Sequence, residues 1–78
     1  MCKIKAKIEA GPIDSERLAR IATIDGKHVE VIVAKKQVIS GMVQAAEIGR
    51  KNNQVLVELP RETTAGYWRV WVNKAAVL

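Results

Sequence analysis

Three lysines alternate with apolar residues near the start of the chain and form a basic strand face. Lys3, Lys5 and Lys7 share one side of residues 3–9, because side chains of an extended strand alternate between two faces. Same-face residues lie about 6.6–6.8 Å apart, so the ladder could follow every second phosphate of a nucleic-acid strand, at about 3.4 Å per phosphate. The ladder predicts phosphate binding, and its alternative is protection of a sheet edge against pairing with another chain.

A second group of residues, near the end of the chain, has the composition of a base-stacking surface. Tyr67, Arg69 and Trp71 alternate along one predicted strand and so share a face. Aromatic rings stack on bases while basic groups hold the nearby phosphates. Alternatively, Trp71 covers the core; we expect Trp68 inside the core and Trp71 on the surface. The residues predicted to contact nucleic acid are Lys3, Lys5, Lys7, Arg50, Lys51, Tyr67, Arg69 and Trp71, with Lys35 and Lys36 widening the basic surface.

The remaining polar residues do not form the constellations that catalysis needs. His28 is the only histidine and follows a predicted turn, which leaves no oriented base for a nucleophile. Cys2 is the only cysteine, which excludes an internal disulfide and a zinc site built on cysteine pairs. Glu58 and Glu62 are the candidates for acid–base work and are more simply surface charges. We expect no catalytic residues, no metal and no cofactor, although an oligomer could build a shared site.

Hydrophobic alternation predicts the strands that position these residues. In the first, Ile4, Ala6 and Ile8 face the core, and Pro60, which lacks an N–H group, ends the fourth. The tail 74–78 is predicted to fold back as a single turn against one end of the core. The predicted strands are residues 3–9, 18–25, 28–34, 54–60 and 67–73.

The clearest hairpin has its turn at Asp25-Gly26-Lys27, because Asp-Gly and Gly-X supply the positive φ angle that tight turns need. If Gly26-Lys27 forms a two-residue loop, Ile21 pairs with Ile32 on the face away from the core. A three-residue loop would instead pair Ile21 with Val31. We prefer the first register, and the second remains open.

Residues 41–48 favour a short helix. Ser40 is a suitable N-cap, residues 42–48 are mostly good helix formers, and Gly49 would end the helix. As a strand, this segment alternates poorly. The run is nevertheless short enough for tertiary contacts to override its helix propensity.

The composition describes a small basic domain. The chain has 78 residues, 49% of them apolar, with a net charge of +5 and a pI near 9.7, and residues 1–78 form a single predicted domain. We expect a mainly β fold, a five- to six-stranded barrel or a strongly curled antiparallel sheet, with one short helix near 41–48. The order of elements is similar to that of an oligonucleotide-binding (OB-like) barrel. An SH3-like barrel fits if residues 42–48 are extended.

Two functions follow from these patterns. The first is non-catalytic nucleic-acid binding, with single strands favoured. The alternative is a protein-interaction or homo-oligomerising module. No apolar run approaches the roughly 20 residues that cross a bilayer, and no signal pattern is present, so we expect a cytoplasmic protein without membrane contacts. The apolar surface that would serve the alternative function consists of Ile21, Ile32, Leu56 and Trp71.

Overall fold

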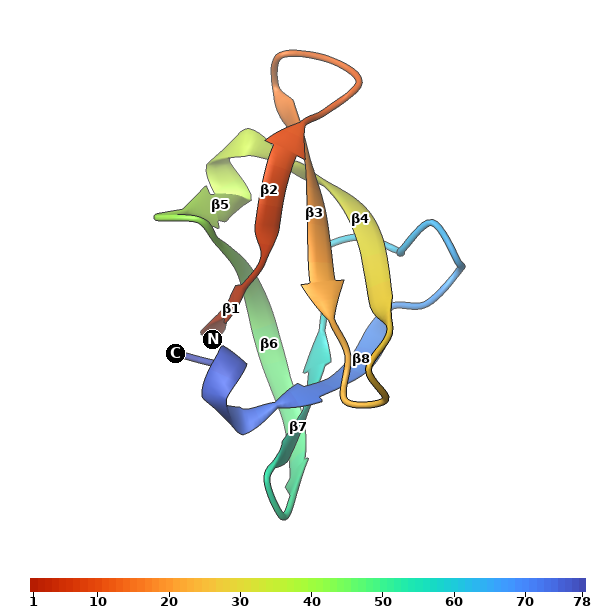
Figure 1. Ribbon diagram of the computed structural model, residues 1–78. Helices are drawn as coiled ribbons and strands as arrows, with labels where there is room; N and C mark the ends of the chain where they lie inside the picture. Colours follow the sequence, from red (N-terminus) through yellow and green to blue (C-terminus); the bar gives the residue numbers. More distant parts are fainter.

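The computed structural model describes residues 1–78 and consists mainly of antiparallel strands in two sheets (Figure 1). The five-stranded sheet has the order β1-β6-β7-β8, with β5 also paired to β6, and the three-stranded sheet has the order β2-β3-β4. The strands are β1 (Cys2–Lys5), β2 (Lys7–Ala10), β3 (Glu16–Ala22), β4 (His28–Ala34), β5 (Val38–Ile39), β6 (Met42–Lys51), β7 (Gln54–Glu58) and β8 (Arg69–Asn73). The 3-10 helices are η1 (Lys35–Gln37) and η2 (Lys74–Ala76).

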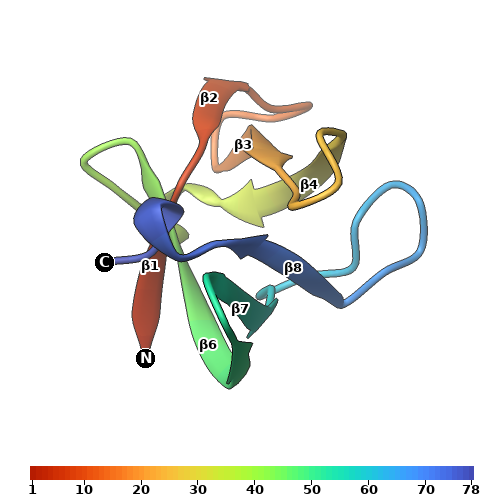
Figure 2. The ribbon, with the colours of Figure 1, turned by 60° about the horizontal axis from the view of Figure 1, so that its bottom comes forward.

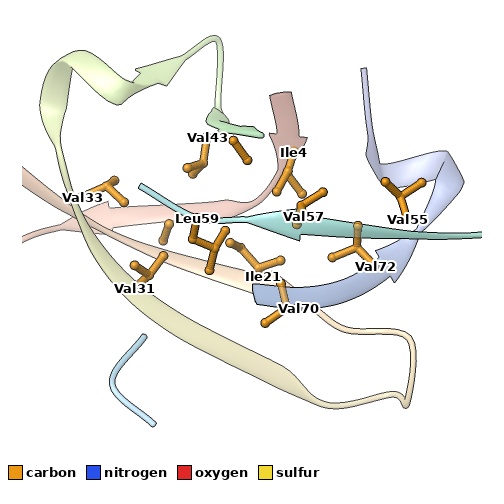
Figure 3. Packing of buried hydrophobic residues seen from close by; sticks show 12 residues of the cluster. Ile4, Ile21, Val31, Val33, Val43, Val55, Val57, Leu59, Val70 and Val72 are labelled. Carbon is orange, nitrogen blue, oxygen red and sulfur yellow. The ribbon is translucent and has the colours of Figure 1, made fainter. Parts of the chain in front are cut away.

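The hydrophobic core lies between the two sheets (Figure 3). Nine of its twelve residues are valine or isoleucine, whose branched side chains suit a pleated, half-buried surface. The five-stranded sheet contributes Ile4, Val43, Ala45, Val55, Val57, Val70 and Val72, and the three-stranded sheet contributes Ala19, Ile21, Val31 and Val33. Leu59, just after β7, completes the core.

The predicted first strand is divided between the two sheets. β1 pairs with β6 and β2 pairs with β3, so the chain changes sheets at Ala6. The predicted inward face is confirmed, because Ile4 is fully buried and Ala6 and Ile8 pack against the core. Lys5 and Lys7, which precede and follow Ala6, therefore belong to different sheets.

The register of the β3–β4 hairpin differs from both predictions. Ile21 pairs with Val29, and the Thr23 N–H donates to the Lys27 carbonyl at 2.8 Å. The loop is therefore Ile24-Asp25-Gly26, with Gly26 at φ 81°, the left-handed conformation that three-residue hairpin loops require. This loop begins two residues before the predicted two-residue loop and one residue before the predicted three-residue loop, and it places Ile21 on the core face.

The helix predicted near 41–48 does not form, because this segment lies in strand β6. Ser40 and Gly41, with φ angles of 52° and 75°, make a two-residue turn between β5 and β6 instead of a helix cap. β6 then pairs with β1, β5 and β7, and these hydrogen bonds outweigh the helix propensity of the segment. The poor alternation has a structural cause: the β6–β7 register shifts between Glu47 and Gly49, which leaves Ile48 as the extra residue of a β-bulge.

The mainly β prediction is confirmed, whereas the closed barrel and the strongly curled sheet are wrong. β4 and β8 do not pair along their length, because the β7–β8 connection occupies part of the β4 edge. In this connection Thr63 bridges Val31, and the Thr64 N–H donates to the Glu30 carbonyl at 2.8 Å. The two sheets therefore remain separate.

The C-terminal tail returns to the first strand, as predicted. η2 makes a single turn, Ala76 and Val77 pack against the core, and Val77 bridges Ile4. Lys3 and Leu78 exchange two backbone hydrogen bonds of 2.9 and 2.8 Å, which brings the two ends of the chain together (Figure 1). β1 is consequently paired on both sides, by β6 and by the tail.

Candidate nucleic-acid interface

The solvent side of the five-stranded sheet, called the outer face below, gathers several of the predicted site residues. The ladder registers place Lys3, Lys5 and Lys51 on the same side of the sheet as Arg69 and Trp71. None of the outer-face residues is buried, whereas the alternate residues of these strands form the core. The outer face comprises Lys3, Lys5, Met42, Gln44, Ala46, Gly49, Lys51, Gln54, Leu56, Glu58, Arg69, Trp71 and Asn73.

The basic ladder and the aromatic strand lie at opposite edges of this face. β6 and β7 separate β1 from β8 by three strand spacings, about 14 Å across the sheet. The two strands are also offset along β6, because Lys3 pairs with Gln44 whereas Trp71 lies, through Leu56, level with Gly49, about five residues or roughly 15 Å further along. Lys7 is not part of the outer face. It lies on β2, in the other sheet, where its register neighbour is Arg20, which forms ion pairs with Glu9 and Glu30 at 3.5 and 2.9 Å.

Edge protection does not explain Lys3. Such protection applies to a strand whose backbone groups lack partners. At Lys3, β6 lies on one side of β1, and the hydrogen bonds with Leu78 occupy the other side. The position of Lys3 therefore leaves its charge available for another role.

The two arginines of the predicted set are held by glutamates. Arg50 makes two hydrogen bonds with Glu47, of 2.8 and 2.9 Å, and Arg69 donates to Glu58 at 3.0 Å. The hydrogen bond with Arg50 lowers the pKa of the Glu47 carboxyl and raises the pKa of Arg50. Both arginines are exposed, yet binding a phosphate would require each to share its guanidinium with a glutamate or to release it.

Lysines and arginines differ in their ion pairing throughout the molecule. Four of the five arginines form ion pairs with glutamate, and none of the eight lysines forms an ion pair. The cations free to meet a polyanion are therefore mainly lysines, and on the outer face they are Lys3, Lys5 and Lys51. The two other candidates, Lys35 and Lys36, belong to η1 and line a separate open depression with Ser15, Glu16 and Arg61.

The aromatic residues border a groove between β8 and the β3–β4 hairpin, called the hairpin groove below. Its volume is about 450 Å³. Tyr67 is 59% exposed and Trp71 is partly buried, so both rings have accessible surface. Figure 2 shows the β3–β4 hairpin above β8. The groove is lined by Thr23, Ile24, Asp25, Lys27, His28, Val29, Ala65, Tyr67, Arg69, Val70 and Trp71.

Sequence reasoning missed the opposite wall of this groove. Lys27 follows the hairpin loop and His28 begins β4, about 40 positions before β8, and only the tertiary fold brings them to the aromatic strand. No local pattern in the sequence signals that contact. The expectation that Trp68 lies inside the core is wrong. Trp68 precedes β8, lies outside the core and is 51% exposed.

The apolar surface considered for a protein partner does not form as predicted. Ile21 is fully buried, because the observed hairpin register turns it toward the core. Ile32 pairs with Leu18 in the three-stranded sheet. Leu56 and Trp71 do meet, directly opposite each other in the β7–β8 ladder, so two of the four predicted residues remain together on the outer face.

No group of three or more His, Cys, Asp and Glu side chains is placed to hold a metal ion. Neither 3-10 helix is long enough to cross a membrane. Comparison with protein-family models, with curated proteins and with solved structures finds no match to this chain. The function must therefore be inferred from its own residues.

Proposed function

We propose that the protein binds single-stranded nucleic acid on the outer face of its five-stranded sheet. The observation that supports this most directly is the sharing of one sheet face by three unpaired lysines and Trp71. The only acidic residue in the outer face is Glu58, and it is paired with Arg69. A strand of nucleic acid crossing from β1 to β8 would meet lysines at one edge and an aromatic ring at the other.

The geometry favours a single strand over a duplex. Stacking on Trp71 requires a base whose face is free, and in a duplex the neighbouring base pairs cover that face. The separation of Lys3 from Trp71, about 14 Å across the sheet and roughly 15 Å along β6, leaves room for several phosphates between the lysines and the stacked base. Leu56, opposite Trp71, extends the apolar contact surface for the same base.

The number of free lysines sets the expected salt dependence. With three phosphates neutralised on a single strand, log K falls with log salt at a slope of about −0.7 × 3, or −2.1. Raising the salt from about 50 to 200 mM would then weaken binding roughly 20-fold. If the paired Arg50 and Arg69 also contacted phosphate, the slope would be about −0.7 × 5, or −3.5, so the slope also shows whether these arginines take part.

The test is a titration with single-stranded and double-stranded oligonucleotides at several salt concentrations, read by tryptophan fluorescence. It uses the Trp68→Phe variant, so that Trp71 is the only reporter. Lys3→Ala/Lys5→Ala should reduce the slope to about −0.7. Lys35→Ala/Lys36→Ala removes the same charge from η1 and is the matched control. Equal effects of the two double variants, or salt-independent binding, would refute this proposal.

The Leu56–Trp71 pair also supports a second candidate, a homodimer formed through the outer face. Partly exposed apolar neighbours on a small domain are typical of interfaces. Leu56→Lys separates the two functions. It would disrupt an apolar dimer contact but keep or strengthen polyanion binding, because it adds a cation beside Trp71. Sedimentation equilibrium and the oligonucleotide titration on the same variant measure both effects.

A further inference from the structure

The hairpin groove contains backbone groups that the sheets leave unused. Leu59 donates its N–H to the Trp68 carbonyl, so the alternation of an antiparallel ladder turns the backbone groups of Arg69 and Trp71 away from β7. On that side, the Trp71 carbonyl accepts a hydrogen bond from the Ile24 N–H at 3.0 Å. Outside the ladders, no backbone hydrogen bond involves the Trp71 N–H or either backbone group of Arg69.

The edge of β4 that faces the groove also has backbone groups that the sheet does not use. The Thr23–Lys27 hydrogen bond and the β3–β4 register turn the backbone of Val29 toward β3, and therefore turn His28 and Glu30 toward the groove side. The Glu30 carbonyl is taken by the Thr64 N–H, and the backbone groups of His28 have no bond outside the ladders. Two strand edges with free donors and acceptors thus border the same groove.

Both ends of the groove are closed, which limits what can enter. At one end, the Ile24–Trp71 hydrogen bond joins the hairpin to β8. At the other end, the Thr64 N–H donates to the Glu30 carbonyl at 2.8 Å, which joins β4 to the β7–β8 connection. Within that connection, the Thr63 N–H donates to the Tyr67 carbonyl at 2.7 Å, and the Thr63 hydroxyl accepts from the Tyr67 N–H at 3.0 Å. An extended peptide needs a groove open at both ends in order to add a strand. A short planar group entering from the solvent side needs no such opening.

The side chains of the groove suit a planar group attached to an anion. Tyr67 and Trp71 supply aromatic surface, and Lys27 is a cation without an ion-pair partner. The one lining carboxylate, Asp25, is occupied within the turn, where it accepts from the Thr23 hydroxyl and from the Lys27 N–H. These bonds lower the pKa of Asp25 and keep its charge engaged inside the hairpin.

We propose that the hairpin groove holds one unstacked base of a bound single strand. The base contacts Tyr67 and Trp71, its polar edge meets the free backbone groups of Arg69 and His28, and Lys27 lies near the adjoining phosphate. The volume of about 450 Å³ is within the range of small-molecule sites and accommodates a nucleotide. This inference rests on the proposed function, and it adds that one position of the strand is read by hydrogen bonds.

The test compares Tyr67→Ala with Trp68→Ala. These neighbouring aromatic residues are exposed to similar extents, but only Tyr67 lines the groove, so Trp68→Ala is the matched control. The probes are single-stranded nonamers of each base and a nonamer with one central abasic nucleotide. Tyr67→Ala should weaken nonamer binding about 10-fold with an unchanged salt slope, and Trp68→Ala less than 2-fold. The backbone amide NMR signals of Arg69 and Trp71 should shift on binding.

The outcomes distinguish failure of the base site from failure of the proposed single-strand binding on the outer face. If nonamers bind with a lysine-dependent salt slope, but Tyr67→Ala behaves as wild type and the groove amides do not shift, the base site is wrong and the proposed function stands. If no nonamer binds at low salt, both fail. If the groove amides respond to an acidic peptide and not to nonamers, the groove belongs to a protein partner and the base site is overturned.

Discussion

The hairpin register can be tested by removing one methyl group at each of two isoleucines. Ile21 is fully buried in the core, and Ile32 lies on the solvent side of the three-stranded sheet. Ile→Val at each position keeps the β-branched shape and the strand preference, so that only burial distinguishes the two variants. Deleting a buried methyl group costs about 0.5–1.5 kcal/mol, whereas changes on a surface stay within about 0.5 kcal/mol.

These costs are large enough to measure in a chain of this length. A loss of 1 kcal/mol lowers the Tm of a 60–100-residue domain by about 4–8 °C, so Ile21→Val should melt several degrees below wild type. Ile32→Val should stay within about 3 °C. Valine is preferable to alanine, because a 2–5 kcal/mol truncation would consume much of the roughly 4–12 kcal/mol expected for 78 residues.

The assay is thermal unfolding followed by circular dichroism, with urea titrations to check that the m-value is unchanged. In the two-residue-loop register, Ile21 and Ile32 share the outward face, and both variants would show equally small changes. A result in which Ile21→Val costs no more than Ile32→Val would therefore refute the observed register and the core assignment that depends on it.

Two further predictions concern the turns. A Cβ atom at Gly11 would lie 2.5 Å from the Glu16 carbonyl oxygen, whereas one at Gly49 meets nothing within 4 Å. Gly11→Ala should therefore cost about 1–3 kcal/mol in urea unfolding and Gly49→Ala should be neutral or mildly stabilising; equal losses would contradict the close approach at Gly11. The Thr23 hydroxyl and the Lys27 N–H lower the pKa of Asp25 below its ordinary value of 3.8, so its stabilising effect is present above about pH 4 and is lost as the pH falls through the lowered pKa. The Tm difference between wild type and Asp25→Asn should shrink between pH 6 and pH 2, and a constant difference would contradict this linkage.

The sequence determined the β character of the protein and the inward side of most strands. Alternation of branched apolar residues with polar ones is a local property, and it placed Ile4, Ala6 and Ile8 on the inward face without any knowledge of their partners. It also fixed the return of the tail, because an apolar C-terminal segment must cover its own side chains.

Alternation did not determine register or pairing. The sequence alone leaves the side of Ile21 open, because Asp25-Gly26-Lys27 allows more than one loop and a shift of one residue in a hairpin turns every side chain to the other face. Residues 42–48 have good helix formers, yet they became a strand because β1, β5 and β7 offered hydrogen-bonding partners on both sides. Such partners are distant in sequence and leave no local signal.

The candidate site shows the same division. The sequence named Lys3, Lys5, Tyr67, Arg69 and Trp71 from residue type and spacing alone. Only the tertiary structure decided that Lys3 and Lys5 share a sheet face with Arg69 and Trp71, and that Arg50 and Arg69 are held by glutamates. Only the tertiary structure, likewise, brought the β3–β4 hairpin to β8 to form the groove. The reason is physical: strand order and ion pairing depend on contacts across the fold, which one-dimensional periodicity does not encode.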